Sequence, residues 1–509
     1  MSRTALIFHG HFYQPPRENP WTGEVEPQPG AAPYHDWNER VYAESYAPNA
    51  AARVGDHFVN NYLHISFNFG PTLLSWMEKH HPDTYQQIIE ADRESALRRS
   101  GHGNAIAQAY GHAILPLCNE RDRLTQVVWG VADFRHRFGR EPESMWLPET
   151  AVNNATLHVL IEQGLRYVIL APAQASRYRA VGGEWHDVAD DSIDTSRAYS
   201  YFHRDGSGRS IAIFFYNGPL ARAIAFEQAL TSSQRLVGMI KAASAGKQMV
   251  NIATDGETYG HHFKFGDLCL AHVLEVEGPR EGFWITNYGE FLDRYPPQHE
   301  VAVAAGPLDE GTAWSCAHGV GRWIRNCGCY TGGEAGWNQE WRGPLRAALN
   351  FLRDGTAEGF EESGSKLFKD PWHARNAYVD VLLKRTSPAE FLAREASRPL
   401  SHADEVRAFM LLEMQRNALL MFTSCGWFFY DISGIETIQV LKYAARVIEL
   451  SDQLGLPSQR ETFLEMLSQA KSNIAGKGTG ADLYVLHAEP SDTWPASDRR
   501  RPDHSRLPA

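Results

Sequence analysis

Short apolar runs alternate with longer amphipathic stretches over the first 300 residues of the chain. The apolar runs predict buried strands, and hydrophobic residues spaced three or four positions apart predict helices. The expected strands are residues 3–8, 62–67, 143–147, 166–170, 198–203, 210–215, 248–253 and 283–286. The expected helices are residues 83–99, 121–137, 155–163, 231–245 and 265–277. This alternation is typical of a parallel sheet or barrel of the α/β class.

The pattern changes after residue 300. Residues 309–343 are rich in Gly, Trp and Cys and predict irregular structure. Helical periodicity dominates beyond them, with expected helices at residues 340–353, 371–385, 402–422, 434–453 and 457–474. We therefore expect three parts: an α/β domain over 1–305, a mainly helical domain over 306–488 with the Gly/Trp/Cys-rich segment at its start, and a disordered tail over 489–509. The tail is polar and offers little to bury.

One further segment, residues 15–48, is polar, rich in Pro and aromatic residues, and has no clear period. We expect a long loop there, and loops of this length in compact enzymes are usually functional.

The composition excludes some classes of protein. The chain has 509 residues, of which 43% are hydrophobic, and a formal net charge of -12. An acidic balance offers no basic field for nucleic acid, so we expect no such partner. Since no run of about 18 apolar residues occurs, we also expect no membrane span. Residues 1–9 lack the apolar core and cleavage site of a signal peptide, so we expect a cytoplasmic protein. The sequence does not indicate an oligomeric state.

Two carboxylates follow predicted strands. Glu149 comes after the strand at 143–147, and Asp255 comes after the strand at 248–253. The carboxyl ends of strands are where β/α folds display catalytic side chains. Two such acids suit glycoside cleavage, with retention at a separation of about 5–5.5 Å and inversion at about 6.5–9.5 Å. Each acid alone is equally compatible with a helix cap or an Asp-Gly turn.

Histidines gather at the same predicted edge. His9 and His11 leave the first strand, His102 lies in a Gly-His-Gly segment, and His261 follows Asp255. Histidine side chains at such an edge hydrogen-bond sugar hydroxyls or bind a metal.

A second cluster combines thiols and an imidazole. Its members are Cys316, His318, Cys327 and Cys329. Cysteine and histidine are the ligands of structural zinc. The one-residue gaps are shorter than the usual Cys-x2-Cys spacing, so reduced thiols in a Gly-rich loop are the alternative. For the chemistry itself we expect no cofactor and no metal.

Four sequence elements together resemble glycoside hydrolase family 57. They are residues 9–15 (His-Gly-His-Phe-Tyr-Gln-Pro), 101–104 (Gly-His-Gly-Asn), 146–149 (Trp-Leu-Pro-Glu) and 255–261 (Asp-Gly-Glu-Thr-Tyr-Gly-His). The resemblance covers residue 3 to about 300, and a weaker match lies near 424–431. The region after about 310 is similar to an uncharacterised helical extension of one branch of the family.

The resemblance implies a fold, an activity and a set of site residues. The implied fold is an incomplete (β/α)7 barrel followed by an α-helical domain. The implied activity is retaining cleavage or transfer on an α-glucan or maltooligosaccharide, as an amylase, 4-α-glucanotransferase or branching enzyme. Glu149 is then the nucleophile and Asp255 the general acid/base. The implied substrate-binding residues are His9, His11, Gln14, His102, Trp146, His261, Trp427 and Asp431.

The sequence departs from the family pattern at two places. Two extra residues precede Gln14 in the first element, which puts its role in question. The last element, Ser-Asp-Trp in the family, is represented by residues 424–427 (Ser-Cys-Gly-Trp) and lacks its Asp. Asp431 is the candidate replacement.

Two other functions are compatible with these residues. One is a metal-dependent hydrolase similar to polysaccharide deacetylases, with His9, His11, His102 and Asp255 around the metal. The other is a non-catalytic barrel that binds glucan.

Overall fold

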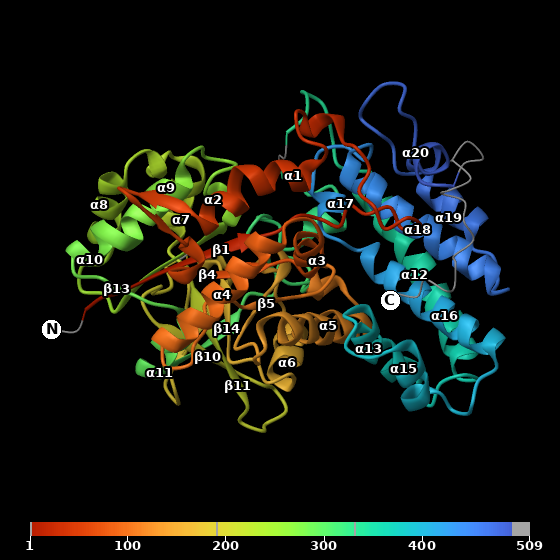
Figure 1. Ribbon diagram of the computed structural model, residues 1–509, viewed down its shortest axis with the longest axis horizontal. Helices are drawn as coiled ribbons and strands as arrows, with labels where there is room; N and C mark the ends of the chain where they lie inside the picture. The colour runs from red at the N-terminus through yellow and green to blue at the C-terminus, as the bar shows by residue number, and fades with distance from the viewer. Residues whose placement is uncertain (1–2, 190–191, 330–331, 491–509) are drawn as a thin grey trace. The chain divides into compact units, whose positions relative to one another are not determined.

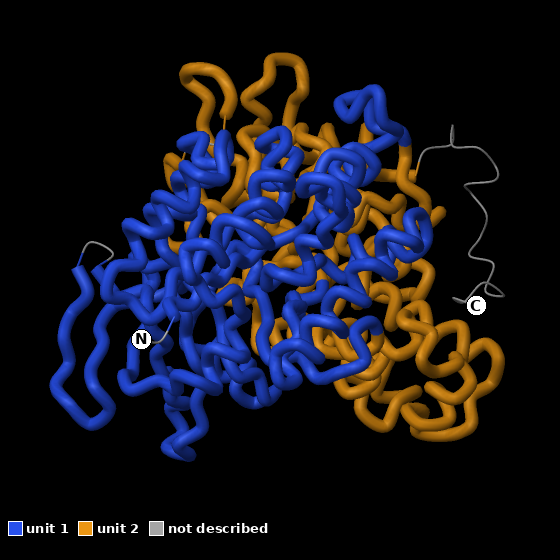
Figure 2. Tube along the Cα trace, turned by 60° about the vertical axis from the view of Figure 1, so that its left-hand side comes forward, with its two compact units in different colours: residues 1–14, 27–110, 137–315 blue, residues 15–26, 111–136, 316–509 orange. Residues whose placement is uncertain are grey.

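The computed structural model describes residues 3–189, 192–329 and 332–490, which form two compact units that interleave along the chain (Figure 2). Unit 1 comprises residues 1–14, 27–110 and 137–315, and unit 2 comprises residues 15–26, 111–136 and 316–509. The division at residue 305 stays a prediction, and unit 1 runs to Ser315. Most of the expected disordered tail, residues 491–509, lies outside the described residues.

Unit 1 contains all the named strands. They are β1 (Ala5–Phe12), β2 (Ala52–Val54), β3 (His57–Val59), β4 (Ser66–Phe69), β5 (Ala107–Gln108), β6 (Met145–Trp146), β7 (Tyr167–Leu170), β8 (Ala175–Ala180), β9 (His186–Asp187), β10 (Ala198–Phe202), β11 (Ser210–Phe215), β12 (Met249–Asp255), β13 (Trp284–Ile285) and β14 (His299–Val303). Each expected strand is present, although β4 and β6 are shorter or shifted. Strand β1 is buried along its whole length, as its apolar run predicts.

Parallel pairing links most of these strands. Strand β1 pairs in parallel with β4, β12 and β13. Parallel contacts continue through the bridge Phe67–Ala105, the β5–β6 pair, the bridge Ser144–Tyr167 and the β7–β11 pair. Beyond β11, the N–H of Asn217 donates to the carbonyl of Asn251 on β12 at 2.8 Å. The predicted α/β class is therefore confirmed.

Strands β8 and β14 were not expected from the sequence. They pair with each other in antiparallel fashion, and β14 also lies beside β10. Five of the six residues of β8 (Ala-Ser-Arg-Tyr-Arg-Ala) are partly buried or exposed. Because little of this strand is buried, it carries no continuous apolar run, and the pattern used for prediction does not detect it.

The helices of unit 1 follow the predicted alternation. They are α1 (Trp37–Val41), α2 (Ala47–Ala50), α3 (Pro71–His80), α4 (Pro82–Arg98), α6 (Asn154–Glu162), α7 (Gly218–Phe226), α8 (Ser233–Ala243), α9 (Gly266–His272), α10 (Gly278–Arg280) and α11 (Tyr288–Arg294). Figure 1 shows α7, α8, α9 and α10 gathered beside β1 and β13. Asn153 caps α6, because its side chain accepts a hydrogen bond from the N–H of Thr156 at 2.9 Å.

The prediction of a loop over residues 15–48 is wrong for its second half. Helix α1 begins after Asp36, whose carboxylate accepts from the N–H groups of Asn38 and Glu39. A π-helical turn at Tyr42–Tyr46 connects α1 directly to α2. Aromatic and polar residues make up most of this stretch, and helices this short show no apolar period.

Unit 2 is helical. Its helices are α5 (Glu120–Phe138), α12 (Arg342–Gly364), α13 (Pro371–Ala377), α14 (Val379–Leu382), α15 (Pro388–Glu395), α16 (His402–Leu420), α17 (Cys425–Phe428), α18 (Ile435–Gln453), α19 (Arg460–Leu467) and α20 (Gly480–His487). Helix α16 packs against α12 and α18, and α12 also contacts α19. The guanidinium of Arg375 is buried and donates to Asp122 at 2.8 Å and to Gln415 at 3.0 Å. This contact joins α5 and α16 through α13.

Two further findings concern the helices and the cysteines. Within the described ranges, no helix combines the length and apolar character that crossing a membrane requires. All six cysteines lie among the described residues, and each is a free thiol.

Candidate active site

An aromatic stack lies at the end of β1. The rings of His9 and His11 stack on Trp146, with centroids 4.7 and 4.9 Å away. The two ring nitrogens of His9 contact Ser66 Oγ and Asn68 Oδ1, each at 3.0 Å. Burial lowers the pKa of both histidines to about 3, against a smaller opposing effect of the Asn68 hydrogen bond. Both imidazoles are therefore neutral near pH 7.

Glu149 lies in a strained turn directly after β6. A short 3-10 helix spans Pro148–Thr150, and both Glu149 and Thr150 have positive φ, at 58° and 49°. Non-glycine residues rarely adopt this left-handed region, and such strain concentrates at functional sites. The Glu149 carboxylate accepts hydrogen bonds from Trp314 Nε1 at 3.0 Å and Ser315 Oγ at 2.7 Å.

Asp255 is the last residue of β12 and pairs with His11 in the register of β1. Asp255 is an exposed residue, but residues 251–254 and 256–260 on either side of it are buried. Desolvation of its carboxyl by the surrounding protein, followed by the negative charge of Glu149, raises the pKa of Asp255 to about 7. The influence of Glu149 requires the two carboxyl groups to be neighbours. The two acids that the sequence predicts thus belong to one group.

A third carboxyl, Glu257, lies behind Asp255 and is buried. It accepts hydrogen bonds from the Tyr13 N–H at 2.9 Å and the Tyr46 hydroxyl at 2.7 Å. Burial and the charge of Asp255 raise the pKa of Glu257 to about 8, although the two hydrogen bonds oppose the rise. Gln14 hydrogen-bonds Tyr46, whose hydroxyl donates to Glu257. Gln14 is therefore linked to the acids indirectly, through Tyr46.

His261 remains at the same end of β12. Its Nδ1 forms a close ion pair with Glu44, and its backbone N–H donates to the carbonyl of Glu257 at 3.0 Å. The side chain is mostly buried. His261 lies near the acids because it follows Asp255 and Glu257 closely in the sequence, and Glu44 orients its ring.

The structure does not bring His102 to this group. The Nδ1 of His102 contacts Glu143 and its Nε2 contacts Asp293, each at 3.0 Å, and Arg166 forms ion pairs with both carboxylates. Glu143 precedes β6 and Arg166 precedes β7, whereas Glu149 follows β6. His102 therefore lies at the amino ends of these strands. The sequence motif marks the correct strand but not which of its ends carries the side chain.

Trp427 and Asp431 belong to unit 2, where both have structural contacts. The indole of Trp427 is fully buried, stacks with the guanidinium of Arg346 at 4.1 Å, and donates to the carbonyl of Arg342 at 3.3 Å. A side chain enclosed in this way offers no face to a sugar.

Asp431 is used as a loop anchor. Its two oxygens accept from the backbone of Ser433, the hydroxyl of Ser472 and the backbone and side chain of Asn473. Burial alone would raise the pKa of Asp431, but these hydrogen bonds outweigh it and lower the pKa. Asp431 thus holds two loops together, and we do not retain it as a binding residue.

Three residues that contact the predicted site residues were not singled out from the sequence. Trp314 and Ser315 hold Glu149, and Asn68 contacts the rings of both His9 and His11. Asn68 stands at the exit of a predicted strand, and this position was a usable signal. Trp314 and Ser315 lie in a segment without periodicity, so only the fold brings them to Glu149.

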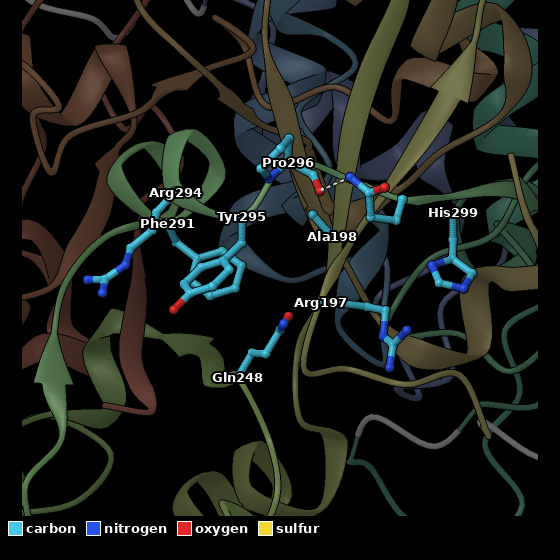
Figure 3. Close-up of a pocket in the computed structure, with 9 residues that line it drawn as sticks. Arg197, Ala198, Gln248, Phe291, Arg294, Tyr295, Pro296 and His299 are labelled. Atoms are coloured by element: carbon cyan, nitrogen blue, oxygen red, sulfur yellow. Dashed lines mark hydrogen bonds between the residues drawn. The ribbon is translucent and has the colours of Figure 1, made fainter. Parts of the chain in front are cut away.

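A separate pocket of about 300 Å³ lies elsewhere in unit 1 (Figure 3). Its lining includes Arg197, Gln248, Tyr295 and His299. Gln248 directly precedes β12, at the strand end opposite Asp255. This pocket contains none of the predicted site residues.

Comparisons with known proteins agree with the elements described above. The profile of Glycosyl hydrolase family 57 matches residues 17–304, and a Domain of unknown function (DUF3536) matches residues 337–495. Alpha-amylase 1 of Dictyoglomus thermophilum is 25% identical over 224 residues, which cover 44% of this chain and 29% of that protein. The chain therefore spans less than a third of the length of this curated relative.

Solved structures show the same fold. An exo-type maltose-forming amylase from Pyrococcus sp. ST04 aligns with a TM-score of 0.66 at 15% identity, over 91% of this chain and 82% of that one. A branching enzyme from Pyrococcus horikoshii aligns with a TM-score of 0.54 at 16% identity, over 94% of this chain and 96% of that one.

Proposed function

Because this chain belongs to glycosyl hydrolase family 57, we propose that it is a retaining enzyme that cleaves or transfers α-glucan chains. The observation that carries the proposal is the effect of Glu149 on Asp255, whose pKa of about 7 lets this carboxyl both hold and release a proton near neutral pH. The relatives named as amylases and as a branching enzyme support an α-glucan or maltooligosaccharide as substrate.

In this mechanism Glu149 attacks the anomeric carbon. Its carboxylate is oriented by hydrogen bonds that Trp314 Nε1 and Ser315 Oγ donate to Oε2. Asp255 donates its proton to the oxygen of the leaving sugar. General acid catalysis of this kind contributes about 10²–10⁴-fold in rate.

The second step reverses the role of Asp255. Once Glu149 is esterified, its negative charge is gone, and the pKa of Asp255 falls because that charge was one cause of the rise. Asp255 then accepts a proton from water or from a sugar hydroxyl. Water gives hydrolysis, and a sugar acceptor gives transfer or branching.

The neutral stack of His9, His11 and Trp146 forms the wall of the proposed sugar subsite. Burial keeps both imidazoles uncharged. A neutral wall avoids repulsion of the positive charge that develops on the sugar ring in an oxocarbenium-like transition state.

We extend the proposal to the architecture. The parallel contacts from β1 through β4, β5, β6, β7 and β11 to β12 support the incomplete (β/α)7 barrel of the family. The catalytic domain is then residues 1–305, followed by the helical domain. Trp314 and Ser315 extend the catalytic machinery ten residues past that boundary.

A metal-dependent deacetylase is not favoured by the geometry. Both ring nitrogens of His9 are engaged by Ser66 and Asn68. Among the described residues, four His, Cys, Asp or Glu side chains lie close enough to share a metal, namely Cys316, His318, Cys327 and Cys329. The side chains around Asp255 are not in that group. A non-catalytic barrel is disfavoured because both acids are retained as neighbours.

The deciding experiment is a product analysis with amylose, glycogen and maltoheptaose. Proton NMR of the first sugar released is expected to show the α-anomer, and the chain-length profile separates hydrolysis, disproportionation and branching. The matched control is Glu143→Gln, since Glu143 and Glu149 flank the same strand. A first product in the β-configuration, or release by Glu149→Gln at the rate of Glu143→Gln, would refute the proposal.

A further inference from the structure

Three thiols and one imidazole converge in unit 2. The cluster consists of Cys316, His318, Cys327 and Cys329, and its potential ligand atoms all lie within 4.8 Å of one another. The Sγ of Cys329 is 3.8 Å from the Sγ of Cys316 and 3.4 Å from Nδ1 of His318. Its three cysteines are free thiols and form no disulfide. We refer to them as the thiol cluster.

These distances match the edges of a tetrahedral zinc site. Zinc binds thiolate at about 2.3 Å and imidazole at about 2.0–2.1 Å. At tetrahedral angles those bonds place two sulfurs about 3.8 Å apart, and a sulfur and a nitrogen about 3.5 Å apart. The observed separations are 3.8 and 3.4 Å. These two separations match a tetrahedral shell, and the remaining ligand atoms lie within 4.8 Å of one another.

The backbone explains how one-residue spacings reach this arrangement. Gly328 has a φ of 78°, a left-handed conformation that turns the chain sharply between Cys327 and Cys329. The N–H of Cys329 then points back to the Sγ of Cys327 at 3.5 Å. The short gap that counted against a metal in the sequence is thus bridged by a glycine turn.

Neighbouring donors fit a cluster of thiolates. The guanidinium of Arg342 donates to the Sγ of Cys327 at 3.8 Å. Backbone N–H groups of His318 and Arg322 hydrogen-bond the Sγ of Cys316. Three thiolates around a divalent ion leave one negative charge, which Arg342 balances. Such outer contacts orient the ligands of metal sites.

We propose that Cys316, His318, Cys327 and Cys329 bind one structural Zn²⁺ ion. Four protein ligands close the coordination sphere, which is the arrangement of structural rather than catalytic zinc. Soft thiolates exclude Mg²⁺ and Ca²⁺, which require oxygen ligands. The ion closes the loop from 316 to 329, whose regular structure is a single short turn at Gly321–Trp323. This loop continues directly from Ser315, so zinc binding limits the freedom of the segment that carries Trp314 and Ser315.

The test measures metal in the full-length protein. Elemental analysis after dialysis against metal-free buffer is expected to give about one zinc per chain. The double variant Cys327→Ser/Cys329→Ser is expected to hold none, whereas Cys269→Ser, which removes a thiol of α9 outside the cluster, keeps the full amount. Removal of zinc by a chelator is expected to lower the Tm by at least about 5 °C.

A second measurement on the unaltered chain covers the case in which the double variant does not fold. Replacement of zinc by Co²⁺ is expected to produce the intense visible bands of a tetrahedral ion with thiolate ligands. Three of the six cysteines should resist a thiol reagent until chelation. The proposal is overturned if metal-depleted protein takes up no stoichiometric zinc, if zinc persists in the double variant, or if an iron–sulfur spectrum or a Cys316–Cys329 disulfide appears.

Discussion

The two ends of the strands in unit 1 carry the same residue types in opposite electrostatic settings. After the strands, Asp255 neighbours Glu149, and burial together with that negative charge raises its pKa to about 7. Before the strands, Glu143 and Asp293 share Arg166 and His102. Burial would raise the pKa of Asp293, but the bonds and charge of Arg166 outweigh it and lower the pKa.

The difference shows what separates an acid suited to proton transfer from an acid that supports the fold. Proton transfer near pH 7 needs a carboxyl whose pKa lies near 7, and an adjacent guanidinium removes that property. Because Arg166 pairs with Glu143 and Asp293 at the amino ends of the strands, we assign these residues to stabilisation of the fold. The absence of a cationic partner among the described neighbours of Asp255 marks the carboxyl-end group as the candidate for chemistry.

The largest expected effect comes from Glu149→Gln. Loss of the nucleophile should lower kcat on maltoheptaose by at least about 10⁴-fold, because the glycosyl-enzyme no longer forms. The Gln side chain keeps an oxygen that accepts from Trp314 and Ser315, so thermal unfolding should change little. Glu143→Gln, at the other end of the same strand, should keep kcat within about threefold. Equal losses for the two variants would erase the distinction between the ends.

Asp255→Asn should have a somewhat smaller effect that depends on the substrate. The loss on natural glucans should reach about 10²–10⁴-fold, since a poor leaving group needs its proton. Substrates with good leaving groups should form the glycosyl-enzyme at a rate closer to that of the unaltered chain. Pre-steady-state kinetics on both substrate types measures this split, with Asp293→Asn as the control. A uniform loss would contradict the role of Asp255 as proton donor.

The pH dependence of stability should follow from Glu257. Its pKa is about 8 in the folded chain and about 4.3 in an unfolded chain. Between these values the folded state holds a proton that the unfolded state has released, so the free energy of unfolding should fall as pH rises, by about 1.4 kcal/mol per pH unit. Glu257→Gln should lower the slope by this amount in urea unfolding at pH 5, 6 and 7, while the contribution of Asp255, whose pKa is about 7, remains.

The control for the slope is Asp293→Asn. Because the pKa of Asp293 is lowered, its contribution is complete above pH 5, and the variant should retain the slope of the unaltered chain. Parallel curves for Glu257→Gln and the unaltered chain would show that Glu257 ionises normally.

The smallest expected effect is that of Arg166→Met. The guanidinium and Asp293 are both partly exposed, so solvent screens the ion pair, and the loss in unfolding free energy should be about 1 kcal/mol or less. Turnover should not change, because Arg166 lies at the amino end of β7, whereas the proposed nucleophile Glu149 follows the carboxyl end of β6. A fall in kcat larger than about tenfold would place the amino-end group within the catalytic machinery.

Particular elements show how far the sequence could be followed. Continuous apolar runs predicted β7, β11 and β12 nearly to the residue, because a strand buried on both faces must be apolar throughout. Strand β8, of which only one residue is fully buried, and the short helices α1 and α2 carry no such pattern. The helix expected at 457–474 ends at Leu467, since the residues that follow have polar turn character.

The candidate site divides in the same way. The motif containing Glu149 and that containing Asp255 predicted both acids, and the structure makes them neighbours. Family membership is confirmed by the profile match. The motif containing His102 and the element at 424–427 named residues that the structure uses for support, because a motif records residue type and order but not the direction of a side chain.

By itself, the sequence determined the α/β class, the order of the strands that carry continuous apolar runs, and the family, because these depend on residues that are close along the chain. Tertiary structure alone decided the rise in the pKa of Asp255, the support of Glu149 by Trp314 and Ser315, and the convergence of four metal-type ligands around Gly328. Each of these depends on a distance between side chains, and such distances are set by strand register, turn conformation and packing rather than by spacing along the chain.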